Sequence, residues 1–160
     1  MAFRLTSPVF ADGAAIPTRH TCDGENRSPM LTWSDPPGGT RSFALLVDDP
    51  DAPAGTFTHW VLYDIPADVR ELSENVPEAT PGVSGRNSFL EMGYGGPCPP
   101  PRDEAHRYQF VLHALDTESL GLSKGASREE VEARMSGHVL ATARLVGSYR
   151  RQASGAAGRR

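Results

Sequence analysis

Residues 42–65 read SFALLVDDPDAPAGTFTHWVLYDI, and this stretch decides the fold. It contains two apolar runs, Ser42 to Val47 and Thr58 to Ile65, whose aliphatic, aromatic and β-branched residues favour strands. Between them lie three aspartates, two prolines and a glycine, which are typical of a turn. With no helical pattern between the runs, the stretch predicts antiparallel strands joined by a loop.

The same pattern continues on both sides of this stretch. His106 to Leu115 forms a third strong strand pattern, and Leu31 to Trp33 and Val9 to Phe10 suit shorter strands. Fourteen prolines and sixteen glycines are spread along the chain between short apolar runs. We therefore predict a mainly β fold, an antiparallel two-sheet β-sandwich.

One convincing helix lies near the C-terminus. Ser127 is followed three residues later by Glu130, which is the pattern of a capping box, and apolar residues continue at helical spacing to His138. The following segment, Val139 to Tyr149, suits either a continued helix or a strand.

The chain of 160 residues is long enough for one domain, which we place at residues 1–150, with a disordered C-terminal tail at 151–160. Sixteen Lys and Arg against twenty Asp and Glu give a net charge of −4, which argues against nucleic-acid binding. No apolar run approaches the roughly 20 residues of a membrane helix, so no integral membrane association is expected. The N-terminus lacks the pattern of a signal peptide, which favours the cytoplasm.

Cys22 and Cys98 are the two cysteines of the chain, and they lack the paired spacing of a zinc or redox site. In a reducing cytoplasm we expect two free thiols. Both cysteines lie in loop-like sequence, so a bond between them stays open as an alternative.

The acidic segment Asp48-Asp49-Pro50-Asp51 follows directly after an apolar strand. Three carboxylates in four positions repel one another, and the prolines at 50 and 53 stiffen the backbone, so the segment is either a functional loop or a solvated turn.

Two further segments carry histidines. Strict strand alternation puts His59 on one face with Val61 and Tyr63, and Trp60 on the other. A single histidine in a strand is more often a core residue that is hydrogen-bonded within the protein than a residue that contacts a ligand. Residues 93–108, GYGGPCPPPRDEAHRY, form a stiff glycine- and proline-rich loop that leads into a strand with His106 and Tyr108 on the same face.

In combination and in this order, these segments resemble the phosphatidylethanolamine-binding proteins, a family that includes the Raf kinase inhibitor protein of animals. The matching pieces cover roughly residues 7–150 and look like the prokaryotic branch. They are Cys22-Asp23-Gly24-Glu25-Asn26, Ser28-Pro29, Leu31-Thr32-Trp33, Asp49-Pro50-Asp51-Ala52-Pro53, His59-Trp60, Gly85 to Ser88, Gly93 to Pro100 and His106-Arg107-Tyr108.

The resemblance implies two antiparallel sheets, a helix near Ser127 to His138, a strand through Tyr149, and a pocket for phosphate, acetate or phosphorylated head groups. In this pocket Asp49, His59 and His106 would form the polar wall beside Tyr108. The other residues implied by position are Pro53 and Trp60 near the wall, and Gly96, Pro97, Cys98 and Pro99 at the rim.

This sequence departs from the animal proteins in two ways. It is shorter at the C-terminus, which predicts an open pocket mouth, and Cys98 stands where animal members have glycine.

The resemblance implies a regulatory protein that binds a small phosphorylated or anionic ligand and is not an enzyme, with no cofactor or metal. The alternatives are a protease or kinase inhibitor that acts through the rim loops, or a hydrolase that uses Asp49, His59 and His106. Because prokaryotic relatives often pair, a homodimer is a further expectation.

Overall fold

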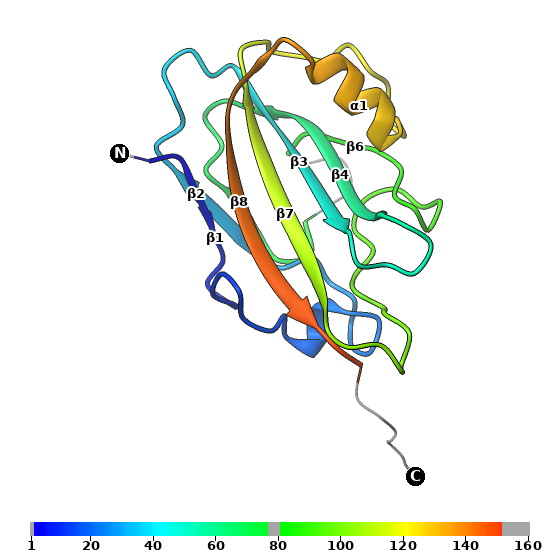
Figure 1. Ribbon diagram of the computed structural model, residues 1–160. Helices are drawn as coiled ribbons and strands as arrows, with labels where there is room; N and C mark the ends of the chain where they lie inside the picture. The colour runs from blue at the N-terminus through cyan, green and yellow to red at the C-terminus, as the bar shows by residue number, and fades with distance from the viewer. Residues whose placement is uncertain (1, 77–80, 152–160) are drawn as a thin grey trace.

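The computed structural model describes residues 2–76 and 81–151, which form two antiparallel sheets, one α-helix and a short 3-10 helix, η1 (Thr18–His20) (Figure 1). The larger sheet has the strand order β6-β4-β3-β7-β8. Its strands are β3 (Ser42–Asp49), β4 (Phe57–Pro66), β6 (Val83–Ser84), β7 (His106–Leu115) and β8 (Val139–Tyr149). The smaller sheet has the order β1-β2-β5, with β1 (Arg4–Thr6), β2 (Leu31–Ser34) and β5 (Glu71–Leu72). The predicted two-sheet fold is confirmed.

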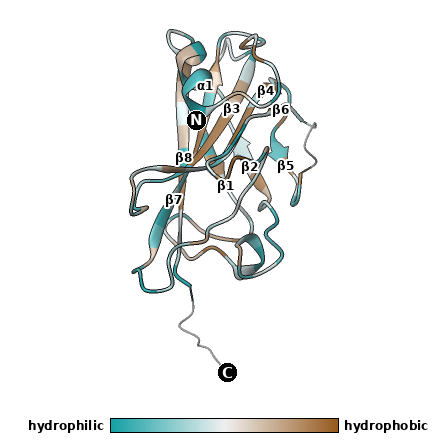
Figure 2. Cartoon of the chain, turned by 90° about the vertical axis from the view of Figure 1, so that its right-hand side faces the viewer, coloured by the Kyte–Doolittle hydropathy of each residue, from teal (hydrophilic) through white to brown (hydrophobic). Residues whose placement is uncertain are grey.

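The main core lies between the two sheets. Leu5, Trp33 and Leu72 of the smaller sheet pack against buried residues such as Phe43 and Phe110 of the larger one. The other face of the larger sheet is covered by α1 (Arg128–Met135), which buries Val131 and Met135 in a second apolar cluster. Figure 2 shows the apolar residues concentrated on central strands such as β3. Both faces of β3 and β4 are therefore buried, and these strands form a rigid frame.

The predicted helix start is confirmed in detail. The Ser127 hydroxyl accepts from the Glu130 backbone N–H, and the Glu130 carboxylate accepts from the Ser127 N–H. The helix ends at Met135, before the predicted end at His138, because Gly137 turns the chain at a φ of +84°. Val139–Tyr149 is a strand, as the family resemblance implied.

Two expectations near the ends of the chain need correction. Val9 and Phe10 form no strand: Phe10 enters the core from a loop, and the first strand, β1, comes earlier. Arg151, which we assigned to a disordered tail, lies against Asp23 with 3.1 Å between nitrogen and oxygen. Residues 152–160 of the predicted tail lie outside the described residues. Within 2–76 and 81–151, no helix is long and apolar enough to cross a membrane.

Strand β4 contains an irregularity that decides the direction of one side chain. Val47 pairs with Trp60 and the next residue, Asp48, pairs with Thr58, so His59 is an extra residue of β4, a β-bulge. The bulge turns His59 toward the face that carries Tyr108, and the two ring centroids lie 5.2 Å apart. The prediction that His59 shares a face with Val61 and Tyr63 is wrong, because strict alternation fails at a bulge.

Candidate functional site

Three strand ends meet at one end of the larger sheet. Because neighbouring strands are antiparallel, the last residues of β3 lie beside the first residues of β4 and β7. A cavity of about 200 Å³ opens there. The residues that line it are Asp49, Ala52, Pro53, Phe57, His59, Phe89, Cys98, Pro99, Pro100, His106 and Tyr108.

The three aspartates at the end of β3 and just beyond it point in different directions, and each has its own cationic partner. Asp48 turns toward the helix and binds Arg128 at 2.8 Å, and Asp51 binds Arg107 at 2.8 Å. The hydrogen bonds from Arg107 lower the pKa of Asp51 to about 2. Asp49 points into the cavity, so the functional interpretation of the acidic segment applies to this residue.

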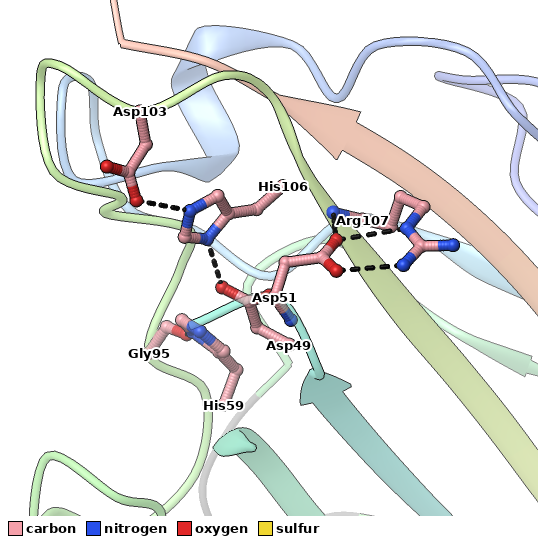
Figure 3. A network of polar contacts seen from close by, with 7 residues as sticks. All are labelled: Asp49, Asp51, His59, Gly95, Asp103, His106 and Arg107. Atoms are coloured by element: carbon pink, nitrogen blue, oxygen red, sulfur yellow. Dashed lines mark hydrogen bonds and ion pairs between the residues drawn. The ribbon is translucent and has the colours of Figure 1, made fainter. Parts of the chain in front are cut away.

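The His106 ring is held between two carboxylates (Figure 3). Its Nδ1 lies 2.6 Å from Asp49 and its Nε2 lies 2.8 Å from Asp103. Burial of the ring disfavours its charge, but the hydrogen bonds to Asp49 and Asp103 raise the pKa of His106. Ionised carboxylates only accept hydrogen bonds, so both ring nitrogens donate and His106 is an imidazolium.

His59 has the opposite character. Its Nδ1 donates to the Gly95 carbonyl at 2.7 Å, and its ring contacts those of Phe57, Phe89 and Tyr108. Burial lowers the pKa of His59, so the ring is neutral near pH 7 and Nε2 acts as an acceptor. One histidine of the cavity is therefore a cation and the other a neutral acceptor.

Tyr108 lines the cavity, and its buried hydroxyl makes no hydrogen bond of full geometry within residues 2–76 and 81–151, although the Asp49 carboxylate is close enough to interact with it. Burial and the nearby charge of Asp49 raise the pKa of Tyr108, so this group is an O–H donor at any physiological pH. A buried hydroxyl without a partner is costly unless something else satisfies it, and the cavity is the place from which a ligand could do so.

The rim loop before β7 is tied covalently to the start of the chain. Cys22 and Cys98 form a disulfide, and the prediction of two free thiols is wrong. That prediction rested on an assumed compartment, whereas bond formation depends on how close the fold brings the two residues. Further contacts hold the loop: the Cys22 N–H donates to the Pro97 carbonyl and the Gly96 N–H donates to Asn26.

Seven of the ten predicted site residues line the cavity, namely Asp49, Pro53, His59, Cys98, Pro99, His106 and Tyr108. Gly96 and Pro97 are buried in the loop behind the rim, and their contacts support its backbone. Trp60 packs on Tyr94 in the main core, where it pairs with Val47, and does not line the cavity.

Sequence reasoning missed four lining residues, namely Ala52, Phe57, Phe89 and Pro100. Ala52, Phe57 and Pro100 lie within or beside the segments already singled out, so inspecting their neighbours would have found them. Phe89 follows directly after the singled-out segment Gly85 to Ser88, so the same inspection would have found it. Asp103 was also missed, although it lies three residues before His106.

The hydrolase alternative required Asp49, His59 and His106 to act together. Both nitrogens of His106 are occupied by carboxylates, and Nδ1 of His59 by a carbonyl. In the described part of the chain, no group of three or more His, Cys, Asp or Glu residues is arranged to hold a metal ion.

Comparison with known proteins shows which family the chain resembles. A family model described as phosphatidylethanolamine-binding protein matches residues 6–150. A UPF0098 protein of Aquifex aeolicus is 54% identical over 148 residues, which cover 91% of this chain and 86% of that protein. A UPF0098 protein of Methanothermobacter thermautotrophicus is 51% identical over 151 residues, which cover 92% of this chain and 98% of that protein.

Two solved structures are similar over nearly their whole length. The YbcL protein of Escherichia coli, described as a member of the mammalian PEBP family, has a TM-score of 0.89 and 37% identity, and the match covers 95% of this chain and 100% of YbcL. A putative phosphatidylethanolamine-binding protein homologue of Chlamydia trachomatis has a TM-score of 0.88 and 38% identity, with 94% of this chain and 99% of that one covered.

Proposed function

The chain belongs to the phosphatidylethanolamine-binding protein family, and from this premise we propose that it binds a small phosphorylated or anionic ligand in the cavity around His106 and Tyr108. The observation that carries the proposal is an imidazolium beside a buried hydroxyl that makes no hydrogen bond of full geometry among the described residues. A charged donor and a neutral donor together suit the oxygens of a phosphate group.

The size and walls of the cavity support a head group as the ligand. A volume of about 200 Å³ is below the roughly 300–1,000 Å³ of ordinary small-molecule pockets. Phe57, Phe89 and the prolines of the rim supply apolar walls. Such a pocket suits a compact polar group that is attached to an apolar or aliphatic portion outside the cavity.

We propose a binding role and not catalysis because the cavity offers no activated nucleophile. Within the described chain its lining includes no serine or threonine, and the sulfur of Cys98 is bonded to Cys22. The acid–base residues are also committed, since Asp49 and His106 bind one another.

Thermal unfolding with added ligand tests the proposal. Inorganic phosphate, O-phosphoethanolamine and ethanolamine are compared, and the first two should raise the midpoint. At 100 times its Kd, a ligand stabilises the protein by about 2.7 kcal/mol. In a domain of this size, each kcal/mol of stabilisation raises the unfolding midpoint by roughly 2–4 °C. No shift with either phosphate compound at concentrations up to the millimolar range would refute the proposal.

Tyr108→Phe identifies the site of binding. It removes only the hydroxyl, so phosphate affinity should fall about 2–10-fold, as expected for one neutral hydrogen bond. Tyr149→Phe is the matched control, because the Tyr149 hydroxyl donates to Asp23 outside the cavity. Equal affinities in both variants would place the ligand elsewhere.

A second candidate function, inhibition of a protease or kinase through the rim, is favoured by one observation. Leu90 is 77% exposed at a φ of +66°, next to the cavity residue Phe89. The Asn87 side chain holds this turn by accepting from the N–H groups of Phe89 and Glu91. Leu90→Asp should abolish inhibition of such a partner without changing phosphate affinity, and retained inhibition would exclude this surface.

A further inference from the structure

Both N–H groups of His106 are hydrogen-bonded to carboxylates of the protein itself (Figure 3). The Asp49 carboxylate accepts a hydrogen bond from Nδ1–H and the Asp103 carboxylate accepts one from Nε2–H. A phosphate oxygen that is to bind this imidazolium directly therefore has no free donor on the ring. One of the two carboxylates therefore has to give up its hydrogen bond to the His106 ring.

The two carboxylates differ in how firmly they are held. The Asp49 side chain is 4% exposed, and its other oxygen accepts from the Asp51 N–H at 2.8 Å. The Asp103 side chain is 34% exposed, and its carboxylate makes no other hydrogen bond or ion pair among the described residues. Asp103 is therefore the carboxylate that can be displaced.

The position of Asp103 in the chain also favours displacement. It ends a turn that is closed by its own N–H donating to the Pro100 carbonyl at 3.0 Å, and Arg102, Glu104 and Ala105 around it are exposed. Rotation of one side chain at this turn frees Nε2 without any movement of the sheet.

We propose that Asp103 is an internal competitor that occupies the anion position on His106 and sets the affinity and selectivity of the cavity. This inference rests on the proposed function. An anion that replaces Asp103 exchanges one charge-assisted hydrogen bond for another, so this contact alone gains little. A ligand gains affinity only from contacts that Asp103 does not make.

The ligand class follows from this exchange. The additional donor is the Tyr108 hydroxyl, so a productive ligand presents one oxygen to His106 and another to Tyr108 while its remaining atoms contact the apolar walls. A phosphate monoester has enough oxygens for both contacts. A simple carboxylate such as acetate should bind the unmodified protein weakly.

Asp103→Ala tests the competition, with calorimetric titration of sulfate, whose charge does not change near neutral pH. A hydrogen bond to a charged group is worth about 1.5–3 kcal/mol, so removing the competitor should tighten sulfate binding about 10-fold or more. Acetate should change from weak to measurable binding. Asp103→Asn should act in the same direction, since a neutral amide competes less well for Nε2–H.

Glu104→Ala is the matched control. It removes the same charge from the next residue of the same loop, and Glu104 faces Arg150 at 3.5 Å instead of His106. Its sulfate affinity should stay close to that of the unmodified protein. An equal rise in the Asp103 and Glu104 variants would mean a general charge effect and would overturn the inference.

The outcomes separate the inference from the proposed function. If the unmodified protein and Asp103→Ala bind sulfate equally tightly, the proposed function stands and the competitor role is refuted. If neither protein binds sulfate or phosphate, both are refuted. Imidazole ¹⁵N spectra of the ligand-free proteins check the contact independently, because only the Asp103 variants should change the Nε2 signal of His106.

Discussion

The pair of His106 and Asp49 is a buried ion pair with little exposure on either side. Their side chains are 5% and 4% exposed, with 2.6 Å between nitrogen and oxygen. Such a pair contributes little net stability as a whole, but removal of one partner leaves the other charge buried and uncompensated. The same two side chains therefore line the cavity and affect the stability of the fold.

His106→Ala should lower the free energy of unfolding at pH 7 by about 3–5 kcal/mol, because Asp49 remains buried without its cation. The double variant with Asp49→Ala should recover part of this loss, since it removes the uncompensated charge. Denaturant unfolding of the two single variants and the double variant measures the coupling. Additive losses would show that the pair is not energetically coupled.

The contributions of the two cavity histidines to the free energy of unfolding should depend on pH in opposite ways. The pKa of His106 is raised, so its contribution is fully present below about pH 6.5 and is lost as pH rises through the folded-state pKa. The pKa of His59 is lowered by burial, so its contribution is present above about pH 6.5 and is lost as pH falls through the folded-state pKa.

NMR titration of the ring protons checks this ordering directly. His59 should remain neutral below about pH 6.5 while His106 remains charged above it. Titration of both rings near the ordinary value would contradict the environments described here.

At the scale of elements, the sequence predicted the strands well because buried strands have a strong apolar pattern. His106–Leu115 was predicted with its bounds, and the Ser127 capping box was predicted residue by residue. The bulge at His59 could not be predicted, because it depends on the register between β3 and β4 and leaves the composition unchanged. Trp60 does lie on the face opposite Val61 and Tyr63, as alternation predicted, so the extra residue accounts for the wrong direction of His59 alone.

The rim loop depends on a glycine at position 96. A Cβ there would lie 2.4 Å from the Asn26 side chain and 2.4 Å from the His20 carbonyl. Gly96→Ala should therefore shift the loop that carries Cys98, with a loss of about 1–3 kcal/mol in unfolding free energy and weaker sulfate binding.

Gly38→Ala is the control for this prediction, because nothing lies within 4 Å of a Cβ at that position. Denaturant unfolding and sulfate titration of both variants provide the comparison. Similar stability in the two variants would show that the loop adapts to the extra methyl group.

At the scale of the whole molecule, the disulfide is the largest feature that the sequence left open. Loop composition indicated where the cysteines lie along the chain, but the 5.4 Å between their Cα atoms is a property of the fold. Structural disulfides are usual in oxidising compartments and in intracellular proteins of hyperthermophiles. The predicted cytoplasmic location and homodimer stay predictions.

Replacement of both cysteines by serine should lower the free energy of unfolding by about 4 kcal/mol, because the bond closes a loop with a sequence separation of 76. Most of this effect should arise in the unfolded chain, which gains freedom when the loop is opened. Denaturant unfolding with and without reductant measures it, and reductant should have no effect on the double serine variant. A loss below about 1 kcal/mol would contradict this account.

The same bond determines how the molecule would respond to force. Tension applied at the two ends passes through the sulfur atoms and leaves the chain between Cys22 and Cys98, including β2 to β6, unloaded. The stretched molecule would be shorter by roughly 250–270 Å until a reductant is added. Because tension enters β7 at His106 and leaves β8 at Tyr149, and these two residues pair with each other, it would unzip the seam between β7 and β8 from the cavity end.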